Sequence, residues 1–321
     1  MLDTPKMLVV GSVAYDSVDT PTGKNDDQLG GSATFFSVAS SYFTDVAVVA
    51  VVGEDFDPGD GQMLSNRGID TSGLVQVDGK TFRWSGSYRE DLNSAITLDT
   101  QLNVFADFAP ELGDDHRDVP FLFLANIDPN IQASVLSQMS TRPKMVACDT
   151  MNLWIDIARP ALVSLIENVD VLLINEAESL QLTGCDSVAL AATDLLDKGL
   201  RAVVIKRGEY GAVVFHNNFT FAVPAYPLVT VTDPTGAGDS FAGGFLGYLS
   251  SVDDTCDDAI RRAAVVGSVM ASFAVESYGL DRLRSLSTTD INARFDAFVQ
   301  LTRFHPLGGG QGLPVQAQFN N

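Results

Sequence analysis

The stretch VTDPTGAGDSFAGGFLGYL places glycines and carboxylates around one turn, directly before an apolar segment. Backbone N–H groups at a helix N-terminus have no intrahelical partners and lie at the positive end of the helix dipole. Gly236, Ala237 and Gly238 would therefore offer an anion site, because glycines also let the backbone approach a phosphate closely. The turn thus predicts phosphate chemistry.

Asp239 stands at the start of the predicted helix, beside this anion site. A carboxylate there would repel a bound anion, so a further use for it is expected. A general base that takes the proton of an attacking hydroxyl would provide that use. The alternative is that Asp239 only caps the helix, which is the interpretation we prefer for Asp233 before Pro234.

The elements that must position this turn follow an α/β rhythm. Near-continuous apolar runs, separated by segments of helical periodicity, suit strands buried on both faces of a parallel sheet with right-handed crossovers. The runs are MLVVGSV, VAVVAVV, FLFLA, MVACD, VDVLLIN and AVVIK. We expect LVTV, Leu228 to Val231, to end a strand before the turn and SFAGGFLGYL to continue as a helix.

Two stretches interrupt this rhythm, at about 15–29 and 75–110. The second contains KTFRWSGSYRE, which alternates as a strand does. Together they predict a small secondary sheet that covers a substrate as a lid, with an ordinary surface hairpin as the alternative. We expect one domain over 1–305 and a disordered tail, rich in Gly and Gln, over 306–321.

The composition limits the classes of partner. Forty-one acidic against 20 basic residues give a formal net charge of −21, which repels nucleic acid and anionic lipid at long range. No apolar run has the length of a membrane span, and the first residues lack a signal-peptide pattern. Three separated cysteines and three isolated histidines predict neither disulfides nor a metal cluster. We expect a cytoplasmic protein with a solvated acidic surface.

The chain has neither GxxxxGK[ST] nor a GxGxxG after its first strand, which indicates another nucleotide fold. DPTGAGDSFAGGFL resembles the C-terminal signature of the ribokinase-like, or PfkB, family of carbohydrate and nucleoside kinases. The resemblance implies a three-layer α/β/α sandwich with a central, mostly parallel sheet and a small β-sheet lid. It further implies that residues 236–238 form the anion hole, that Asp239 is the catalytic base and that Thr235 helps to bind the nucleotide.

Two earlier segments resemble the substrate side of the family. GSVAYD is similar to its opening strand, which implies that Asp16 accepts substrate hydroxyls, with a turn aspartate as the alternative. GGSATFF is similar to its first signature, which implies substrate contacts at Gly30, Gly31 and Ser32. The family usually has an asparagine four residues beyond the second glycine, where this chain has Phe35. One polar contact with a sugar is therefore missing.

Two segments follow strands and resemble parts of the family that surround the phosphates. LLINEAE is similar to its NxxE motif, so that Asn175 and Glu178 would hold magnesium and phosphate through water. An ordinary helix start is the alternative for this short motif. DTMNLW is similar to a segment that lines the site, with Asp149 and Asn152 as polar liners.

VVIKRGEYGAVVF is a hairpin-like pair of strands that matches the family stretch beside the nucleotide phosphates. The resemblance places Gly208 and Gly211 there and lets Lys206 supply positive charge, with an edge-strand lysine as the alternative. RRAAVVGSVMASFAVE reads as a small-residue helix that would form a wall of the adenine pocket, with packing alone as the alternative.

The combined hypothesis is an ATP-dependent kinase that phosphorylates a hydroxyl, a primary CH2OH, of a sugar-like molecule. The resemblance adds magnesium, potassium as an activating ion, and a homodimer built through the lid. Arg83 and Arg89 in the lid would meet a phosphate on the substrate or simply be exposed. A non-catalytic sensor that binds nucleotides or sugars is the alternative from another class.

Aromatic residues crowd the first signature and the lid, and their flat faces could stack on a nucleobase. A nucleoside kinase is therefore the nearest alternative to a sugar kinase. Packing of the lid or of a dimer interface would explain the same residues. They are Phe35, Phe36, Phe82, Trp84, Tyr88, Phe105 and Phe108.

Overall fold

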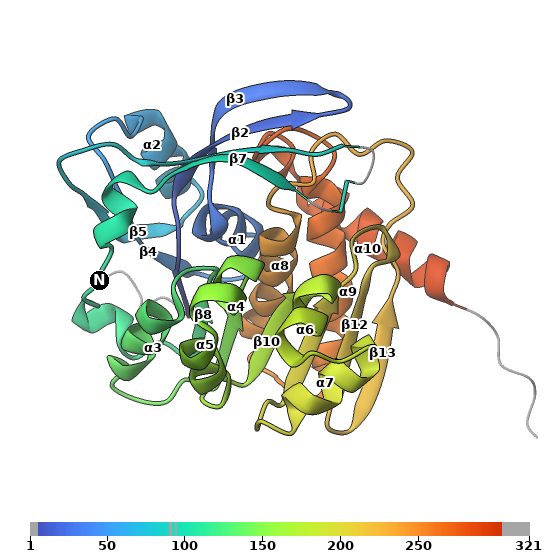
Figure 1. Cartoon of the computed structure of the whole chain (residues 1–321). Helices are drawn as coiled ribbons and strands as arrows, with labels where there is room; N and C mark the ends of the chain where they lie inside the picture. Colours follow the sequence, from blue (N-terminus) through green and yellow to red (C-terminus); the bar gives the residue numbers. More distant parts are fainter. Residues whose placement is uncertain (1–5, 90–91, 94, 304–321) are drawn as a thin grey trace, which may run out of the picture.

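The structure is a computed structural model that describes residues 6–89, 92–93 and 95–303 (Figure 1). The predicted tail, 306–321, lies outside the described residues. Within them the chain forms a large sheet of nine strands. From edge to edge these are β13 (Phe219–Val223), β12 (Ala212–His216), β11 (Ala202–Lys206), β10 (Val171–Asn175), β9 (Met145–Asp149), β8 (Phe121–Leu124), β1 (Met7–Val10), β4 (Val46–Val52) and β5 (Asp70–Gln76).

The strands of this sheet run in one direction except β12, which is antiparallel to both of its neighbours, β11 and β13, at one edge. In the centre, Val9 of β1 pairs with Val48 of β4 and with Phe123 of β8. Alternate residues enter separate cores, since Val9 packs on one face of the sheet and Leu8 on the other. The near-continuous apolar runs of the sequence therefore reflect burial on both faces.

Helices cover both faces of the sheet. They are α1 (Ser32–Ser40), α2 (Pro58–Asn66), α3 (Pro129–Ser137), α4 (Asn152–Ile157), α5 (Arg159–Ile166), α6 (Glu176–Thr183), α7 (Val188–Leu196), α8 (Ala237–Val252), α9 (Asp257–Ala274) and α10 (Thr288–Thr302). One core joins the sheet to α1, α8, α9 and α10, and the other joins it to α3 through α7. The predicted three-layer α/β/α architecture is confirmed (Figure 1).

A second sheet of four strands, here named the lid sheet, lies across one end of the molecule (Figure 1). Its order is β3 (Gly23–Gly30), β2 (Ala14–Thr20), β6 (Phe82–Ser87) and β7 (Ile96–Gln101). The two central strands, β2 and β6, are parallel, and each edge strand is antiparallel to its neighbour. The small sheet that the strand-like alternation predicted is therefore present.

The predicted strand at Leu228–Val231 is wrong. Residues 224–236 run as irregular backbone from the end of β13 to α8. Pro224 and Pro227 cannot donate to a ladder, and the side chain of Val229 is fully exposed. The apolar alternation of LVTV thus has neither a neighbouring strand nor a core to face.

Glycines inside α8 allow this helix to pack closely against two neighbours. A Cβ at Gly243 would lie 2.4 Å from the carbonyl oxygen of Phe36 in α1. A Cβ at Gly244 would lie 2.9 Å from the carbonyl oxygen of Val266 in α9. The paired glycines therefore serve helix packing, and this packing holds the N-terminus of α8 in place.

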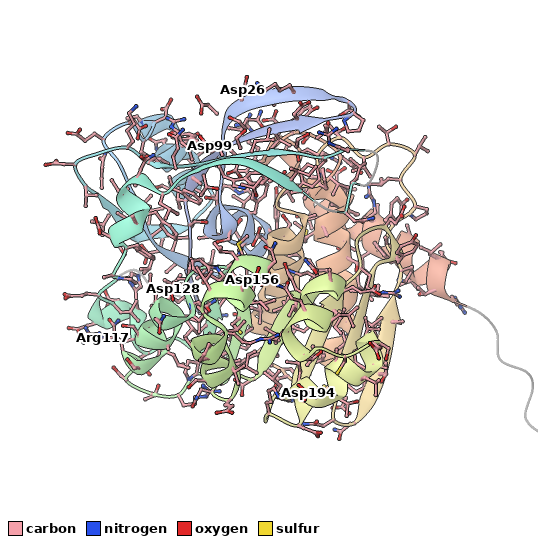
Figure 2. The ribbon with its side chains drawn as sticks, viewed as in Figure 1. Asp26, Asp99, Arg117, Asp128, Asp156 and Asp194 are labelled. Carbon is pink, nitrogen blue, oxygen red and sulfur yellow. The ribbon has the colours of Figure 1, made fainter. Side chains whose placement is uncertain are left out.

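Acidic side chains are spread over many elements rather than gathered in one patch. Figure 2 labels five of them, Asp26, Asp99, Asp128, Asp156 and Asp194, on both the lid sheet and the helices of the large sheet. In the part of the chain that the structure describes, no helix combines the length and apolarity needed to cross a bilayer.

Candidate functional site

The glycine-rich turn enters α8 through a left-handed residue. Gly236 is the N-cap of α8 with φ of 73°, a conformation that favours glycine. A Cβ at Gly236 would also lie 2.3 Å from the ring of Phe35. The next residues, Ala237 and Gly238, begin the helix, so their N–H groups lie at its N-terminus, where anions bind favourably.

Asp233 shapes this turn from within. Its side chain is buried, and its two carboxylate oxygens accept hydrogen bonds from the backbone N–H groups of Thr235, at 2.9 Å, and Gly279, at 3.2 Å. Asp233 is therefore structural but does not cap α8 as expected, because the N-cap is Gly236 and no side chain caps this helix. Its carboxylate instead links the turn to the segment that follows α9.

Asp239 lies in the first turn of α8 and is partly buried. Burial raises the pKa of its carboxyl to about 8, and the negative charges of Asp149 and Asp16 add to the shift. The charge of Lys206 opposes it. A carboxyl with a pKa near neutrality is suited to taking and returning a proton at physiological pH.

Lys206 and Asp149 form a buried ion pair at the carboxyl ends of β11 and β9. Nζ of Lys206 lies 2.7 Å from Oδ2 of Asp149, and these side chains are 18% and 4% exposed. Burial alone would lower the pKa of Lys206, but the charges of Asp149 and Glu178 raise it overall. Nζ would be 3.1 Å from a Cβ at Gly238, which places this cation beside the glycine-rich turn.

Asn175 and Glu178 form a capping box at the start of α6. The side chain of Asn175 accepts from the N–H of Glu178 at 2.8 Å, and Oε2 of Glu178 accepts from the N–H of Asn175 at 2.9 Å. Burial raises the pKa of Glu178 to about 7, although Lys206 opposes the shift. The NxxE motif is therefore an ordinary helix start that also brings a carboxyl within reach of the Lys206 charge.

Gly208 and Gly211 bracket the turn between β11 and β12. Both have positive φ, 53° and 90°, and the N–H of Arg207 donates to the carbonyl of Gly211 at 2.8 Å. Asn93, from the segment between β6 and β7, accepts from the N–H of Glu209 at 3.2 Å. The expected hairpin is confirmed, and a lid segment reaches it.

Asp16 in β2 lies against the two glycines that precede α1. It is 8% exposed, and its Oδ2 accepts from the N–H of Gly31 at 3.3 Å. A Cβ at Gly30 would lie 2.0 Å from the same oxygen. Burial raises the pKa of Asp16 to about 7, and the charge of Asp233 adds to it. Ser32 then fixes the start of α1, because its N–H donates to Oγ of Ser12 at 3.0 Å.

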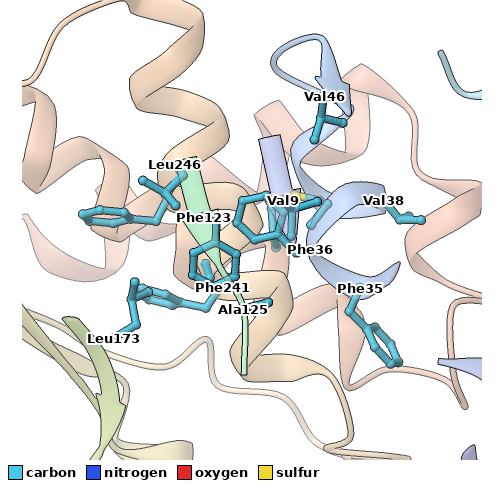
Figure 3. Close-up of a cluster of buried hydrophobic side chains, with 14 of the residues drawn as sticks. Val9, Phe35, Phe36, Val38, Val46, Phe123, Ala125, Leu173, Phe241 and Leu246 are labelled. Carbon is cyan, nitrogen blue, oxygen red and sulfur yellow. The ribbon is translucent and has the colours of Figure 1, made fainter. Parts of the chain in front are cut away.

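Two predicted substrate contacts, Phe35 and Asn152, differ in their burial. Phe35 is 1% exposed, and Figure 3 shows its ring directed away from the cluster around Phe36 and Phe123. This ring packs directly against Gly236 and is buried, so it offers no free face to a substrate. Asn152 is exposed at the start of α4, where its Oδ1 accepts from the N–H of Leu153 at 3.0 Å. Packing therefore uses Phe35, whereas Asn152 is exposed and its role as a polar liner stays a prediction.

Most lid aromatics pack on one another. Phe105 stacks on Phe82 and on Phe108, each with ring centroids 5.3 Å apart, so packing explains these three. Arg83 forms ion pairs with Asp27 and, at 2.9 Å, with Asp55. These two ion pairs already engage the guanidinium of Arg83, so they do not support the expected contact with a phosphate on the substrate.

A cluster that the sequence did not predict attaches the lid sheet to the C-terminal half. The hydroxyl of Tyr278 lies 3.0 Å from that of Thr20 and 3.1 Å from that of Thr22. Both threonines also donate to the carbonyl of Thr232 at 3.0 Å. No local pattern signals this contact, because it joins residues more than 200 positions apart.

The chain matches the family described as pfkB family carbohydrate kinase over residues 5–283. It is 30% identical over 256 residues to cytidine kinase of Thermococcus kodakarensis, which covers 77% of this chain and 89% of that protein. The nucleoside kinase of Burkholderia thailandensis in complex with inosine has a TM-score of 0.74 at 20% identity, covering 94% of this chain and 100% of that chain. Fructokinase from Vibrio cholerae in its fructose, ADP and calcium ion bound form has a TM-score of 0.72 at 21% identity, covering 91% and 100%.

The two solved structures show that the fold is shared, while the family match spans most of the chain. Proteins that match this chain are kinases by name, which removes the support for a non-catalytic sensor. The chain belongs to the pfkB family of carbohydrate kinases and is a phosphotransferase that uses an alcohol group as acceptor.

Proposed function

We propose that this kinase transfers the γ-phosphate of ATP to a primary hydroxyl of a nucleoside. The observation that carries the proposal is the pairing of Asp16 with Trp84 in the lid sheet. Because β2 and β6 are parallel and these residues are in register, their side chains lie on the same face of the sheet. A carboxylate able to accept sugar hydroxyls thus stands beside an indole able to stack on a base.

The indole of Trp84 is held in a defined orientation. Its ring would be 2.1 Å from a Cβ at Gly86, so the ring lies along the strand across this glycine. Its Nε1 donates to Oγ1 of Thr97 at 3.3 Å. The ring is only partly buried. A fixed and partly open aromatic face loses little entropy when a planar group stacks on it.

The charges described near this face favour an uncharged acceptor. Lys206 is paired with Asp149, and Arg83 lies on the opposite face of the lid sheet, in register with Tyr15. Asp16 and Asp239 would repel a second phosphate or a carboxylate on the acceptor. A nucleoside carries no such group.

Asp239 would act as the general base. Its carboxylate takes the proton of the acceptor hydroxyl as the hydroxyl oxygen bonds to phosphorus and the bond from phosphorus to the leaving oxygen of ADP breaks. The N–H groups of Gly236 and Gly238 would stabilise the charge on the transferring oxygens. The N–H of Ala237 donates to the carbonyl of Pro234 at 3.2 Å, so it would have to share its hydrogen with the phosphate. Lys206, beside Gly238, would add positive charge at the same place.

The residues near Lys206 fit magnesium bound mainly through phosphates and water. No group of three or more metal-ligating side chains occurs among the described residues, so a site made of protein ligands alone is not supported there. Glu178 has a buried carboxyl with a pKa of about 7, and only one of its oxygens serves the capping box. Magnesium, when bound, would screen phosphate charge and favour the ionised form of Glu178. Thr235, Gly208 and Gly211 would complete the nucleotide side.

Two relatives support a nucleoside as the acceptor, while others are an inositol 3-kinase, a deoxyribokinase and a fructokinase. The cytidine kinase of Thermococcus kodakarensis matches 77% of this chain, and a nucleoside kinase of Methanocaldococcus jannaschii is 24% identical over 72% of it.

Cysteine usage and composition favour a cytoplasmic location. A homodimer through the lid is a further proposal, since the edge strand β7 exposes Ile96 and Leu98 by 46% and 61%.

The experiment is an assay of phosphoryl transfer from ATP to matched sets of nucleosides and free sugars, with Trp84→Leu alongside. Loss of stacking should reduce kcat/KM for a nucleoside by about tenfold or more, because one base–aromatic stack contributes about 1–3 kcal/mol. The variant should change kcat/KM for free sugars little. A preference of the unmodified chain for free sugars, or an equal loss with both sets, would contradict the nucleoside proposal.

A further inference from the structure

Tyr88 follows β6 and continues its pairing with β2, since its N–H donates to the carbonyl of Asp19 at 2.8 Å. Strand alternation places residues 84, 86 and 88 on one face, the face that also carries Asp16. Trp84 and Tyr88 therefore stand on either side of Gly86, both facing the inside of the lid sheet.

The hydroxyl of Tyr88 reaches the glycine-rich turn. Oγ1 of Thr235 donates to it at 3.4 Å, which is a contact between the lid and the segment that carries Asp239. Burial raises the pKa of Tyr88 to about 12, and the charges of Asp233, Asp16 and Asp239 add to the shift. The phenol is therefore protonated at neutral pH, with its oxygen occupied by Thr235 and its proton available to donate.

The side chains around this hydroxyl are mostly hydrogen-bond acceptors. Asp16 and Asp239 can accept hydrogen bonds from hydroxyls of the substrate. Both oxygens of Asp233 already accept from backbone N–H groups. A nucleoside also presents oxygens and nitrogens that need a donor, such as the ribose ring oxygen or a base carbonyl. Tyr88 can supply that donor from the lid.

We propose that Tyr88 is a specificity-determining residue that donates a hydrogen bond from the lid to a polar atom of the acceptor. The inference rests on the proposed phosphorylation of a nucleoside. A buried hydrogen-bond donor without a partner costs free energy, so a substrate that lacks the matching atom binds less well. Tyr88 thus selects substrates that carry a hydrogen-bond-accepting atom near the reacting hydroxyl.

Tyr278 is the matched control, because its hydroxyl also joins the lid to the C-terminal half. Its partners are the hydroxyls of Thr20 and Thr22, and they lie at the hairpin between β2 and β3. Tyr278→Phe therefore removes a lid attachment without removing a donor beside Asp16 and Asp239. Tyr88→Phe keeps the ring and removes the donor.

The test measures kcat and KM of the unmodified chain and both variants with one good nucleoside and with analogues that each lack one ring oxygen or base carbonyl. Tyr88→Phe should raise KM for the nucleoside by about five- to tenfold, the effect of one hydrogen bond of about 1–1.5 kcal/mol, and leave KM for ATP within about twofold. One analogue should lose its penalty in Tyr88→Phe but keep it in Tyr278→Phe.

Two results would overturn the role of Tyr88. The first is a nucleoside KM in Tyr88→Phe equal to that of an active, unmodified chain. The second is that every analogue keeps its full penalty in Tyr88→Phe. If the unmodified chain phosphorylates no nucleoside at all, the proposed function itself fails, and this outcome is distinguishable because it does not depend on either variant.

Discussion

Two acidic regions lie on opposite faces of the lid sheet and differ in how their charges are compensated. The inner acidic site contains Asp16, Asp149, Asp239 and Glu178, beside the glycine-rich turn. The outer acidic hollow has a volume of about 370 Å³. It is lined by Tyr15, Asp27, Leu29, Asp55, Asp57, Asp60 and Arg83.

In the outer acidic hollow, donors compensate Asp55. Burial alone would raise the pKa of Asp55, but hydrogen bonds from Thr81 and the charge of Arg83 lower it below its usual range. In the inner acidic site, burial and like charges raise the pKa of Asp239 to about 8 and of Asp16 to about 7. Asp55 is thus kept ionised on the outer face, whereas Asp16 and Asp239 are poised to exchange protons on the inner one. Burial also raises the pKa of Asp60 in the outer acidic hollow.

The largest expected effect comes from removing the proposed base. Asp239→Asn should lower kcat by about two to four orders of magnitude, because general-base catalysis contributes that much. Asp60→Asn is the matched control in the outer acidic hollow, where the amide oxygen can still accept from Tyr15. Steady-state kinetics should show activity within about twofold of the unmodified chain for this control. Turnover of Asp239→Asn at an undiminished rate would remove Asp239 from the role.

Removing the buried cation should cost stability as well as activity. Lys206→Met leaves Asp149 buried without its partner, which we expect to lower the free energy of unfolding by about 3–5 kcal/mol at neutral pH. Denaturant titration of the variant measures this loss. The double variant Lys206→Met, Asp149→Asn should recover most of it. Equal instability of the single and double variants would show that the ion pair is not the cause.

The raised pKa of Asp239 predicts a stability cost that depends on pH. The unfolded chain loses this proton near pH 4 and the folded chain near pH 8, so the contribution of Asp239 to stability falls as pH rises through this window. Asp239→Asn should therefore be more stable than the unmodified chain at pH 9, by about 1–3 kcal/mol once partial exposure is allowed for. Denaturation at pH 5 and pH 9 measures the difference, which should be smaller at pH 5. A difference independent of pH would contradict the shift.

The smallest effect is expected in the outer acidic hollow. Arg83→Met breaks ion pairs with Asp27 and Asp55 in which Asp27 is 66% exposed, so the free energy of unfolding should fall by less than about 1 kcal/mol. Activity with a nucleoside should stay within about twofold, since Arg83 faces away from Asp16. A loss of activity beyond tenfold would mean that the two faces of the lid sheet are not independent.

The fold could be predicted largely from local patterns, but the irregular backbone at Leu228–Val231 could not. Near-continuous apolar runs indicated doubly buried strands, and β1, β4, β8, β9, β10 and β11 lie where those runs are. LVTV has the same local character, yet Leu228–Val231 forms no strand because no partner lies beside it. Strand formation needs a neighbour that a short pattern does not specify.

The residues of the candidate site could be predicted as types and positions but not as pairs. The glycine-rich turn, the Asn175–Glu178 motif and the hairpin at Gly208 follow from neighbours in the sequence. Phe35 was expected to face a substrate and instead lies under Gly236. The sequence did not distinguish Trp84 from the six other aromatic residues that could stack on a base, whereas its register with Asp16 does.

The sequence by itself determined the local chemistry of the opening turn: N–H groups at a helix N-terminus, a glycine with positive φ and a carboxylate in the first turn of α8. Only the tertiary structure decided that Lys206 pairs with Asp149, that Asp16 shares a face with Trp84, and that the lid reaches Thr235 through Tyr88. The physical reason is that backbone conformation depends on adjacent residues, whereas pairing, burial and pKa depend on groups that the folded chain brings together.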